Sequence, residues 1–392
     1  MIYTHFMSES ERLSQDCGEQ KRLVSLDAYR GFMMLWIIGG SGLAKALAGL
    51  QSTETGVLAA MIVQLKHVEW EGLRFYDLIF PSFIFIVGVS LVYSLSRMKS
   101  ETHRGKATIK VIRRGLLLWL IGIIYYGGIS QGLYDEALQQ GVRLLGVLQR
   151  IGICYLVAGI LFLFVPLRGL ISVFCGLLVG YWVLLTFVSV PGQPEISYQE
   201  GKNLSDWFDS QYLPFFKWNG THDPEGILST FPAIATCLLG VFAGLFLKEA
   251  TCSQKKKCLS LAIAGLVLAI LGFLWGESFP VIKNLWTSSF VLMAGGWSLI
   301  LLSIFFGSIE VLGRRKWATP LIWVGMNSIA IYLVTSILDF NELALRVFGG
   351  PVAQWFDSLV PGLGELITMV FSLAMLLWLC RVLYQRKVFL KV

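Results

Sequence analysis

The chain has 392 residues, of which 55% are apolar and only 15% are charged, and its mean hydropathy is +0.67. Soluble globular chains of this length do not normally combine these values, so the composition predicts an all-α polytopic membrane protein. The net charge of +7 is then a sign of orientation in the bilayer, and it gives no reason to expect a nucleic-acid partner.

Ten stretches are apolar and long enough to cross about 30 Å of hydrocarbon as helices. They begin near residues 31, 77, 112, 144, 168, 228, 258, 285, 319 and 362. Basic residues are concentrated in alternate connections, and the long connection over about residues 190–226 is acidic. Because basic loops stay in the cytoplasm, we expect cytoplasmic tails at residues 1–24 and 386–392 and one membrane domain over residues 25–385. The acidic loop then lies outside.

Several patterns are missing from the sequence. No cysteine falls in an outside loop, so no disulfide framework is expected. The predicted spans hold Cys154, Cys175, Cys237 and Cys380, and the cytoplasmic side holds Cys17, Cys252 and Cys258. The first 24 residues lack an apolar core, which argues against a cleavable signal peptide. The chain also has no metal-ligand spacing, phosphate-binding loop or nucleophile elbow, so no metal site is expected.

The polar run from Lys66 to Asp77 leads directly into the second predicted span. Its histidine, His67, has three carboxylates nearby in sequence, on Glu69, Glu71 and Asp77. A carboxylate partner fixes the tautomer of an imidazole and raises its basicity, which a general base needs. The pattern therefore favours proton-transfer chemistry at the outer lip of a helix, and the alternative is an ordinary interfacial histidine.

Two polar side chains inside the predicted spans call for a bonding partner. Arg150 lies about two turns inside the fourth span, where a buried guanidinium needs a partner. Asp77, at a similar depth, is the expected partner, either in a structural ion pair or beside a substrate. Asn327 lies within the ninth span and costs free energy unless a helix or a ligand bonds to it.

Charged residues also mark the ends of several predicted spans. Outside, Asp223, Pro224 and Glu225 have the pattern of a helix N-cap, a first-turn proline and a first-turn acid, so the sixth span is expected to start there. On the cytoplasmic side, the ends of the first and third spans carry a basic cluster that suits phosphate binding or simple orientation of the helices. This cluster consists of Arg30, Lys110, Arg113 and Arg114.

Six short runs occur in a familiar order and spacing. They are Ser25–Gly31, Trp70–Gly72 with Asp77–Pro81, Gly146–Arg150, Asp223–Leu228, Lys283–Thr287 and Gly325–Ile329. Through them the chain, from about residue 22 to its C-terminus, resembles the heparan-alpha-glucosaminide N-acetyltransferase family, including its bacterial members. The resemblance implies an integral protein of the bacterial inner (plasma) membrane. It also implies an acyltransferase domain that moves acetyl groups from cytoplasmic acetyl-CoA to the amine of a terminal glucosamine across the membrane.

The resemblance, together with the charge and position of the side chains, suggests roles for individual residues. His67 is the expected general base or acetyl carrier, with Asp77 or Glu71 stabilising its imidazolium form. The acceptor side is assigned to Glu69, Trp70, Arg150, Asp223, Glu225, Asn284, Trp286 and Asn327. Acetyl-CoA is assigned to Arg30, Ser41, Lys110, Arg113 and Arg114, where Ser41 stands in place of an asparagine of the animal members.

The expected partners are an amino sugar or short saccharide, acetyl-CoA and the lipid bilayer, and a homodimer is left open. Two other functions fit parts of the pattern. Ten helices with intramembrane polar residues also suit a secondary transporter of amino sugars. Acyl transfer to the hydroxyls of a surface polysaccharide would keep the chemistry and change the acceptor.

Overall fold

The computed structural model describes residues 23–50, 56–99, 101–128, 132–135 and 140–389. These residues form a helical bundle, as the composition predicts. Within the described ranges, the β structure is a two-residue antiparallel ribbon of β1 (Tyr134–Asp135) and β2 (Gln140–Gly141), with one isolated bridge between Glu71 and Ile282. Cys17 and most of the predicted N-terminal tail lie outside the described residues.

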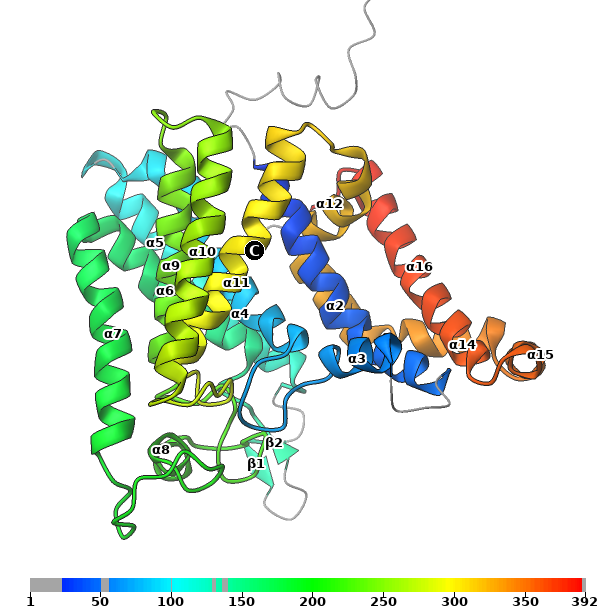
Figure 1. The fold of residues 1–392 in the computed structure, drawn as a ribbon, viewed down its shortest axis with the longest axis horizontal. Helices are drawn as coiled ribbons and strands as arrows, with labels where there is room; N and C mark the ends of the chain where they lie inside the picture. The colour runs from blue at the N-terminus through cyan, green and yellow to red at the C-terminus, as the bar shows by residue number, and fades with distance from the viewer. Residues whose placement is uncertain (1–22, 51–55, 100, 129–131, 136–139, 390–392) are drawn as a thin grey trace, which may run out of the picture.

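Successive long helices run in alternating directions through the bundle, except the last, which runs in the same direction as the long helix before it (Figure 1). They are α2 (Val24–Gly49), α4 (Ile79–Leu95), α5 (Glu101–Tyr125), α6 (Val147–Phe164), α7 (Leu167–Phe187), α9 (Thr230–Lys248), α10 (Gln254–Gly276), α11 (Ser288–Phe306) and α16 (Leu363–Gln385). The shorter helices are α3 (Val57–Gln64), α8 (Leu204–Tyr212), α12 (Thr319–Met326), α13 (Ser328–Ile337), α14 (Phe340–Phe348) and α15 (Pro351–Leu359). Single helical turns complete the list: η1 (Phe75–Leu78), η2 (Ser96–Met98), η3 (Gly307–Val311) and η4 (Lys316–Ala318).

The described part of the chain has eight helices long and apolar enough to cross a membrane, or nine if a bent pair counts as one span. Nine of the ten predicted spans are thus matched among the described residues. The exception is α5, because its charged residues leave only the 11 residues from Gly115 to Tyr125 without charge. That length is about 16 Å, roughly half of the hydrocarbon thickness. The other nine predicted stretches coincide with the observed helices.

The bent pair is α12 and α13, which meet at an angle of 66°. Asn327 lies at the break, where the sequence predicts a continuous span. Its side-chain Nδ2 donates to the backbone oxygen of Val388 at 3.1 Å, so a segment near the end of the chain satisfies this amide. A buried amide inside a membrane protein is stabilised in this way without a ligand.

Close packing between α4 and α9 fixes the part of the bundle that carries the candidate site. A Cβ atom on Gly88 would lie 2.0 Å from the carbonyl oxygen of Cys237, and one on Gly240 would lie 2.0 Å from that of Phe85. Small residues allow helices to approach this closely in a membrane. Because α4 follows η1 and α9 follows the acidic loop, this contact holds those two segments in a fixed relation.

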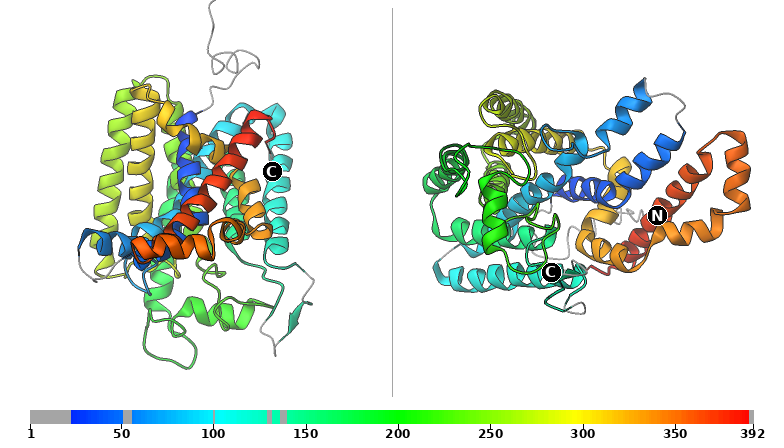
Figure 2. Two further views of the ribbon diagram at one scale, coloured as in Figure 1. Left: turned by 90° about the vertical axis from the view of Figure 1, so that its right-hand side faces the viewer. Right: turned by 90° about the horizontal axis from the view of Figure 1, so that it is seen from below.

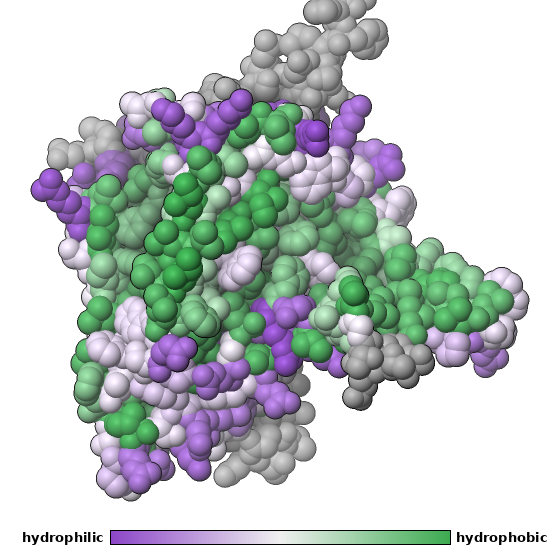
Figure 3. Space-filling model, in the orientation of Figure 1, coloured by the Kyte–Doolittle hydropathy of each residue, from purple (hydrophilic) through white to green (hydrophobic). Residues whose placement is uncertain are grey.

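The two ends of the bundle differ in character. α2 begins and α16 ends at the same end, which we call the basic end, together with the connections that follow α4, α6 and α9 (Figures 1 and 2). α8 and the β ribbon lie at the opposite end, which we call the loop end. Figure 3 shows an apolar band between hydrophilic residues at both ends. The chain is thus an integral membrane protein with several spans.

Candidate functional site

A cavity of about 660 Å³ lies at the loop end, a size usual for small-molecule sites. Segments far apart in the sequence form its walls. Its aromatic lining consists of Trp70, Phe80, Tyr125, Tyr126, Trp218, Trp286 and Tyr332. Its polar lining consists of His67, Glu69, Asp77, Arg143, Glu225, Lys283 and Asn284. Such a lining offers flat aromatic faces together with acidic and basic side chains.

The structure brings His67 and Asp77 together in this wall. His67 Nδ1 lies 2.6 Å from Asp77 Oδ1, and the Asp77 side chain is fully buried. The turn η1 folds this carboxylate back, so its Oδ2 accepts the backbone N–H groups of Val68 and Arg74, each at 3.2 Å. The His67 side chain is 54% exposed. Asp77 is therefore placed to orient the ring, and the other ring nitrogen remains available to a substrate.

Lys283 is the third member of this group, and sequence reasoning did not single it out. Its Nζ lies 3.2 Å from Asp77 Oδ1 and 3.0 Å from His67 Nδ1. Burial lowers the pKa of Lys283, and the neighbouring Asp77 opposes that shift. The run Lys283–Thr287 indicates that this segment matters, but it does not identify the partner of Lys283, because Asp77 lies 206 positions away in the sequence.

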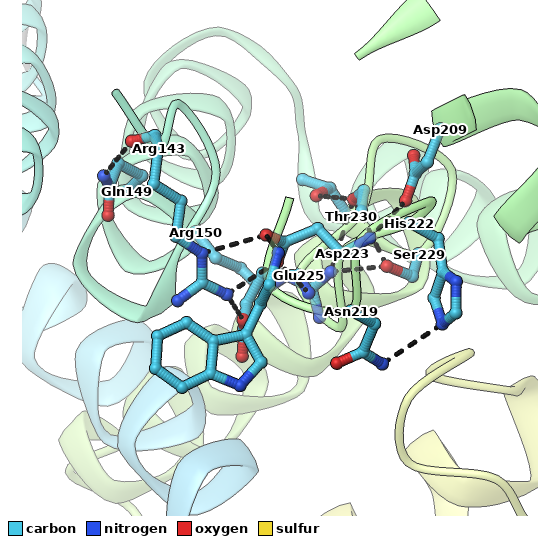
Figure 4. Close-up of polar contacts among 12 residues, drawn as sticks. Arg143, Gln149, Arg150, Asp209, Asn219, His222, Asp223, Glu225, Ser229 and Thr230 are labelled. Atoms are coloured by element: carbon cyan, nitrogen blue, oxygen red, sulfur yellow. Dashed lines mark hydrogen bonds and ion pairs between the residues drawn. The ribbon is translucent and has the colours of Figure 1, made fainter. Parts of the chain in front are cut away.

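Arg143 forms a second charged cluster in the cavity wall, which Figure 4 shows. Its Nε and Nη2 donate to the two carboxylate oxygens of Asp223 at 2.9 and 2.7 Å, and Nη2 also donates to Glu225 at 2.6 Å. The guanidinium stacks on Tyr126 and Trp218, with 4.5 and 5.0 Å to their ring centroids. Burial opposes the charge of Arg143, yet the two carboxylates raise its pKa above the usual value.

The loop that carries Asp223 and Glu225 differs from the predicted helix start. α9 begins at Thr230, after this loop, because the Asp223 carboxylate binds Arg143 and the backbone N–H of Glu225. Asp209 on α8 supports the loop by accepting the N–H groups of Ile227 at 2.9 Å and Asp223 at 3.4 Å. Burial raises the pKa of Asp209 to about 6.

The predicted pairing of Arg150 with Asp77 is wrong. Arg150 Nη2 instead donates to the Gly226 carbonyl, at 3.3 Å, and to the Ser229 hydroxyl. Its guanidinium stacks over Trp286, 5.0 Å from the ring centroid. Arg150 faces the start of α9 and not η1. It supports a cavity wall from behind, since Trp286 lines the cavity and Arg150 does not.

The remaining acceptor residues divide into two groups. Glu69, Trp70 and Asn284 line the cavity, and Trp70 Nε1 donates to the Tyr198 carbonyl at 2.8 Å. Asn327 is not among the lining residues, and Asp223 acts through Arg143. The exposed Glu71 is also absent from the lining, and its backbone pairs with Ile282 in the isolated bridge. Of the two carboxylates expected to stabilise the imidazolium, the structure therefore places Asp77, and not Glu71, in contact with His67.

The residues assigned to acetyl-CoA lie apart from the cavity lining. Lys110 and Arg113 are exposed on α5, and the Arg114 guanidinium stacks on Tyr155 at 4.7 Å from the ring centroid. Arg30 pairs with Asp27 at 3.3 Å and donates to the Ser90 hydroxyl at 2.6 Å.

Ser41 lies elsewhere, at the other end of α2 from Arg30. Its side chain hydrogen bonds with Tyr76, and the Tyr76 ring lies 4.6 Å from the His67 ring between centroids. Ser41 is thus on the His67 side of the protein and not among the basic residues.

The match to a known family decides how this arrangement is interpreted. Residues 22–278 match the family described as heparan-alpha-glucosaminide N-acetyltransferase, catalytic. The chain belongs to this family. The matched region contains His67, Asp77, Arg143 and the acidic loop, and it ends just before Lys283.

Two mammalian relatives show the same likeness at low identity. The chain is 28% identical to the mouse heparan-alpha-glucosaminide N-acetyltransferase over 388 residues, which cover 83% of this chain and 56% of the mouse protein. It is 30% identical to the human protein of that name over 332 residues, covering 70% of this chain and 49% of the human one. The chain thus spans about half the length of the curated relatives it matches.

Proposed function

We propose that this protein moves an acetyl group from acetyl-CoA to the amine of glucosamine or of a short glucosamine-containing saccharide. The observation that carries the proposal is the His67–Asp77 pair, 2.6 Å apart, in the wall of an aromatic-lined cavity of a family member. A buried carboxylate bound to one ring nitrogen is the usual way to prepare an imidazole for proton transfer. We place the active site in this cavity.

The chemistry that His67 supplies is removal of a proton from the acceptor. Asp77 holds Nδ1, so Nε2 faces the reaction as the acceptor amine attacks the thioester carbonyl. The new C–N bond forms, the C–S bond breaks, and the proton leaves the nitrogen through Nε2. The same Nε2 lone pair also suits a first attack on the thioester, with acetyl-histidine as an intermediate. Both routes use the observed His67–Asp77 contact.

The acceptor site is suited to a cation with a flat ring. Glu69 and Glu225 contribute carboxylates to the cavity, and they attract the ammonium form of an amino sugar. Trp70, Trp218 and Trp286 give aromatic faces on which the ring can stack. These features support an amine acceptor more directly than a hydroxyl acceptor.

Access from two sides completes the proposal. Acetyl-CoA enters from the basic end, which we assign to the cytoplasm together with both termini, and the sugar enters from the loop end. Exposed Lys110 and Arg113 at the basic half of α5 are available to phosphates of CoA. From the resemblance to bacterial members of the family, we assign the protein to the bacterial inner (plasma) membrane.

Purified protein in liposomes tests the function directly. With acetyl-CoA loaded inside and glucosamine outside, we expect N-acetylglucosamine to appear outside, measured by mass spectrometry. Accumulation of unmodified glucosamine inside would replace the proposal with a secondary transporter. Acetylation of hydroxyl groups alone would keep an acetyltransferase and reject the amine acceptor.

Neutralising Arg113 and Arg114 together tests the acetyl-CoA side. Each charge-assisted phosphate contact is worth about 1.5–3 kcal/mol, so Arg113→Gln with Arg114→Gln should raise the Kd for CoA by at least about tenfold. The KM for the sugar should not change. Arg314→Gln with Lys316→Gln removes two exposed charges elsewhere at the basic end and serves as the matched control. An unchanged Kd for CoA, measured by calorimetry, would show that Arg113 and Arg114 serve only to orient the helix.

A further inference from the structure

One carboxylate at the site has two neighbours that can both carry positive charge. Lys283 Nζ lies 3.2 Å from Asp77 Oδ1. His67 Nδ1 lies 2.6 Å from the same oxygen. Nζ and Nδ1 are themselves only 3.0 Å apart, and both groups line the cavity.

These contacts determine where the protons lie. Oδ1 of Asp77 faces His67 and Lys283, and Oδ2 accepts the backbone N–H groups of Val68 and Arg74. An ionised carboxylate only accepts hydrogen bonds, so the hydrogen between Asp77 and His67 belongs to Nδ1. The lone pair of the neutral ring is then on Nε2. In this tautomer Nδ1 carries a hydrogen and has no free lone pair to accept a hydrogen bond from Lys283. The 3.0 Å separation between Nζ and Nδ1 therefore places the positive charge of Lys283 next to the ring without a hydrogen bond to it.

The group of His67, Asp77 and Lys283 has no net charge when the imidazole is neutral. With the ring neutral, the charges of Lys283 and Asp77 cancel. A proton on Nε2 would leave a net charge of +1 beside a fully buried carboxylate and a lysine that is only 18% exposed. A like charge this close disfavours the charged form of its neighbour. The His67–Asp77 pair alone would have the opposite preference, because a lone carboxylate stabilises an imidazolium.

The other groups around the ring contribute charges of both signs. The Tyr76 ring packs on His67 with 4.6 Å between centroids. Arg74 Nη1 donates to the His67 backbone oxygen at 2.8 Å and adds a second positive charge nearby. Glu69 and Glu225 line the same cavity, but Glu225 is bound to Arg143 at 2.6 Å.

We propose that Lys283 is a positioning residue that keeps His67 unprotonated by competing for the single carboxylate of Asp77. This inference rests on the proposed acetyl transfer, and it specifies the path of the proton from the acceptor amine through His67 to the sulfur of CoA. As the C–N bond forms, Nε2 takes the proton of the acceptor amine and holds it weakly beside Lys283. The proton passes to the sulfur of CoA as the C–S bond breaks. An amide and a thiol leave, and His67 returns to its neutral form.

The test measures protonation of His67 without requiring turnover. Diethylpyrocarbonate modifies neutral imidazole and not imidazolium, and the half-exposed His67 is open to the reagent. Peptide mass spectrometry follows modification of His67 against pH in the full-length protein. In Lys283→Met, we expect the pH of half-maximal modification to rise by about one unit or more. In Lys283→Arg, which keeps the charge, it should stay close to the wild-type value.

Two controls separate this effect from a general change of charge or shape. Lys202→Met removes an exposed lysine of the acidic loop at the same end and should leave the modification profile of His67 unchanged. His103, exposed on α5, reports the reagent and pH in every sample. If Lys283→Met fails to reach the membrane, Lys283→Gln replaces it, because its uncharged amide can still donate a hydrogen bond to Asp77. We expect the same rise in the pH of half-maximal modification for that variant.

The outcomes distinguish this inference from the function on which it rests. An unchanged modification profile in the neutral Lys283 variants would overturn it. A shifted profile, with the acidic limb of the acetyl-transfer rate also moved to higher pH, supports both. If the profile shifts but the wild-type protein transfers no acetyl group, the effect of Lys283 on His67 is supported and the proposed function is rejected.

Discussion

Replacing His67 by alanine is expected to lower the rate of acetyl transfer by about 10²- to 10⁴-fold, the usual worth of a positioned acid–base group. The fold should survive, because the imidazole is half exposed and its loss leaves Asp77 bound to Lys283 and to two backbone N–H groups. Binding of acetyl-CoA should change little, since the basic residues assigned to it are not in the cavity lining.

The measurement pairs a rate with a binding constant and a melting temperature on the same preparation. Lys66→Ala, an exposed neighbour in the same loop, is the matched control for disturbance of the loop. Wild-type turnover in His67→Ala would end the catalytic role of this residue. Loss of the variant from the membrane would point instead to a histidine that stabilises the loops at the loop end.

Local features of this chain could be predicted from the sequence because they depend on near neighbours. Apolar length locates nine stretches that became helices or the bent pair. The His67–Asp77 contact joins residues ten positions apart and was among the partners considered for His67. The α5 helix shows the limit of this reasoning, because its position in the sequence suggests a span while its charges shorten the apolar part.

Contacts between distant segments could not be predicted in the same way. Lys283 and His67 are 216 positions apart in the sequence, and Arg143 and Asp223 are 80 positions apart. The residues around each of them give no indication of its partner. Arg150 illustrates the physical reason. Its depth in the membrane follows from position along α6, but which neighbour it meets depends on how the helix is rotated. In this chain the rotation of α6 turns Arg150 toward Ser229, just before α9.

Replacing Arg143 by methionine is expected to lower the free energy of unfolding by about 3–5 kcal/mol, the usual cost of removing one partner of a buried ion pair. The Asp223 side chain is fully buried and that of Glu225 is 11% exposed, so both carboxylates would be left without their cation. Tyr126 and Trp218 would also lose the guanidinium between them. The loss should therefore be seen both in stability and in the KM for the sugar.

A surface ion pair of the same chain provides the comparison. Arg346 lies 3.9 Å from Glu342, with side chains 72% and 60% exposed, so Arg346→Met should cost no more than about 1 kcal/mol. Unfolding of both variants in the same detergent gives the difference. Adding Asp223→Asn and Glu225→Gln to Arg143→Met should recover part of the stability, because neutral amides are less costly to bury than unpaired carboxylates. If Arg143→Met unfolds like Arg346→Met, the cavity wall does not depend on this cluster, and contacts such as those of Asp209 and Arg150 are enough to hold the loop before α9.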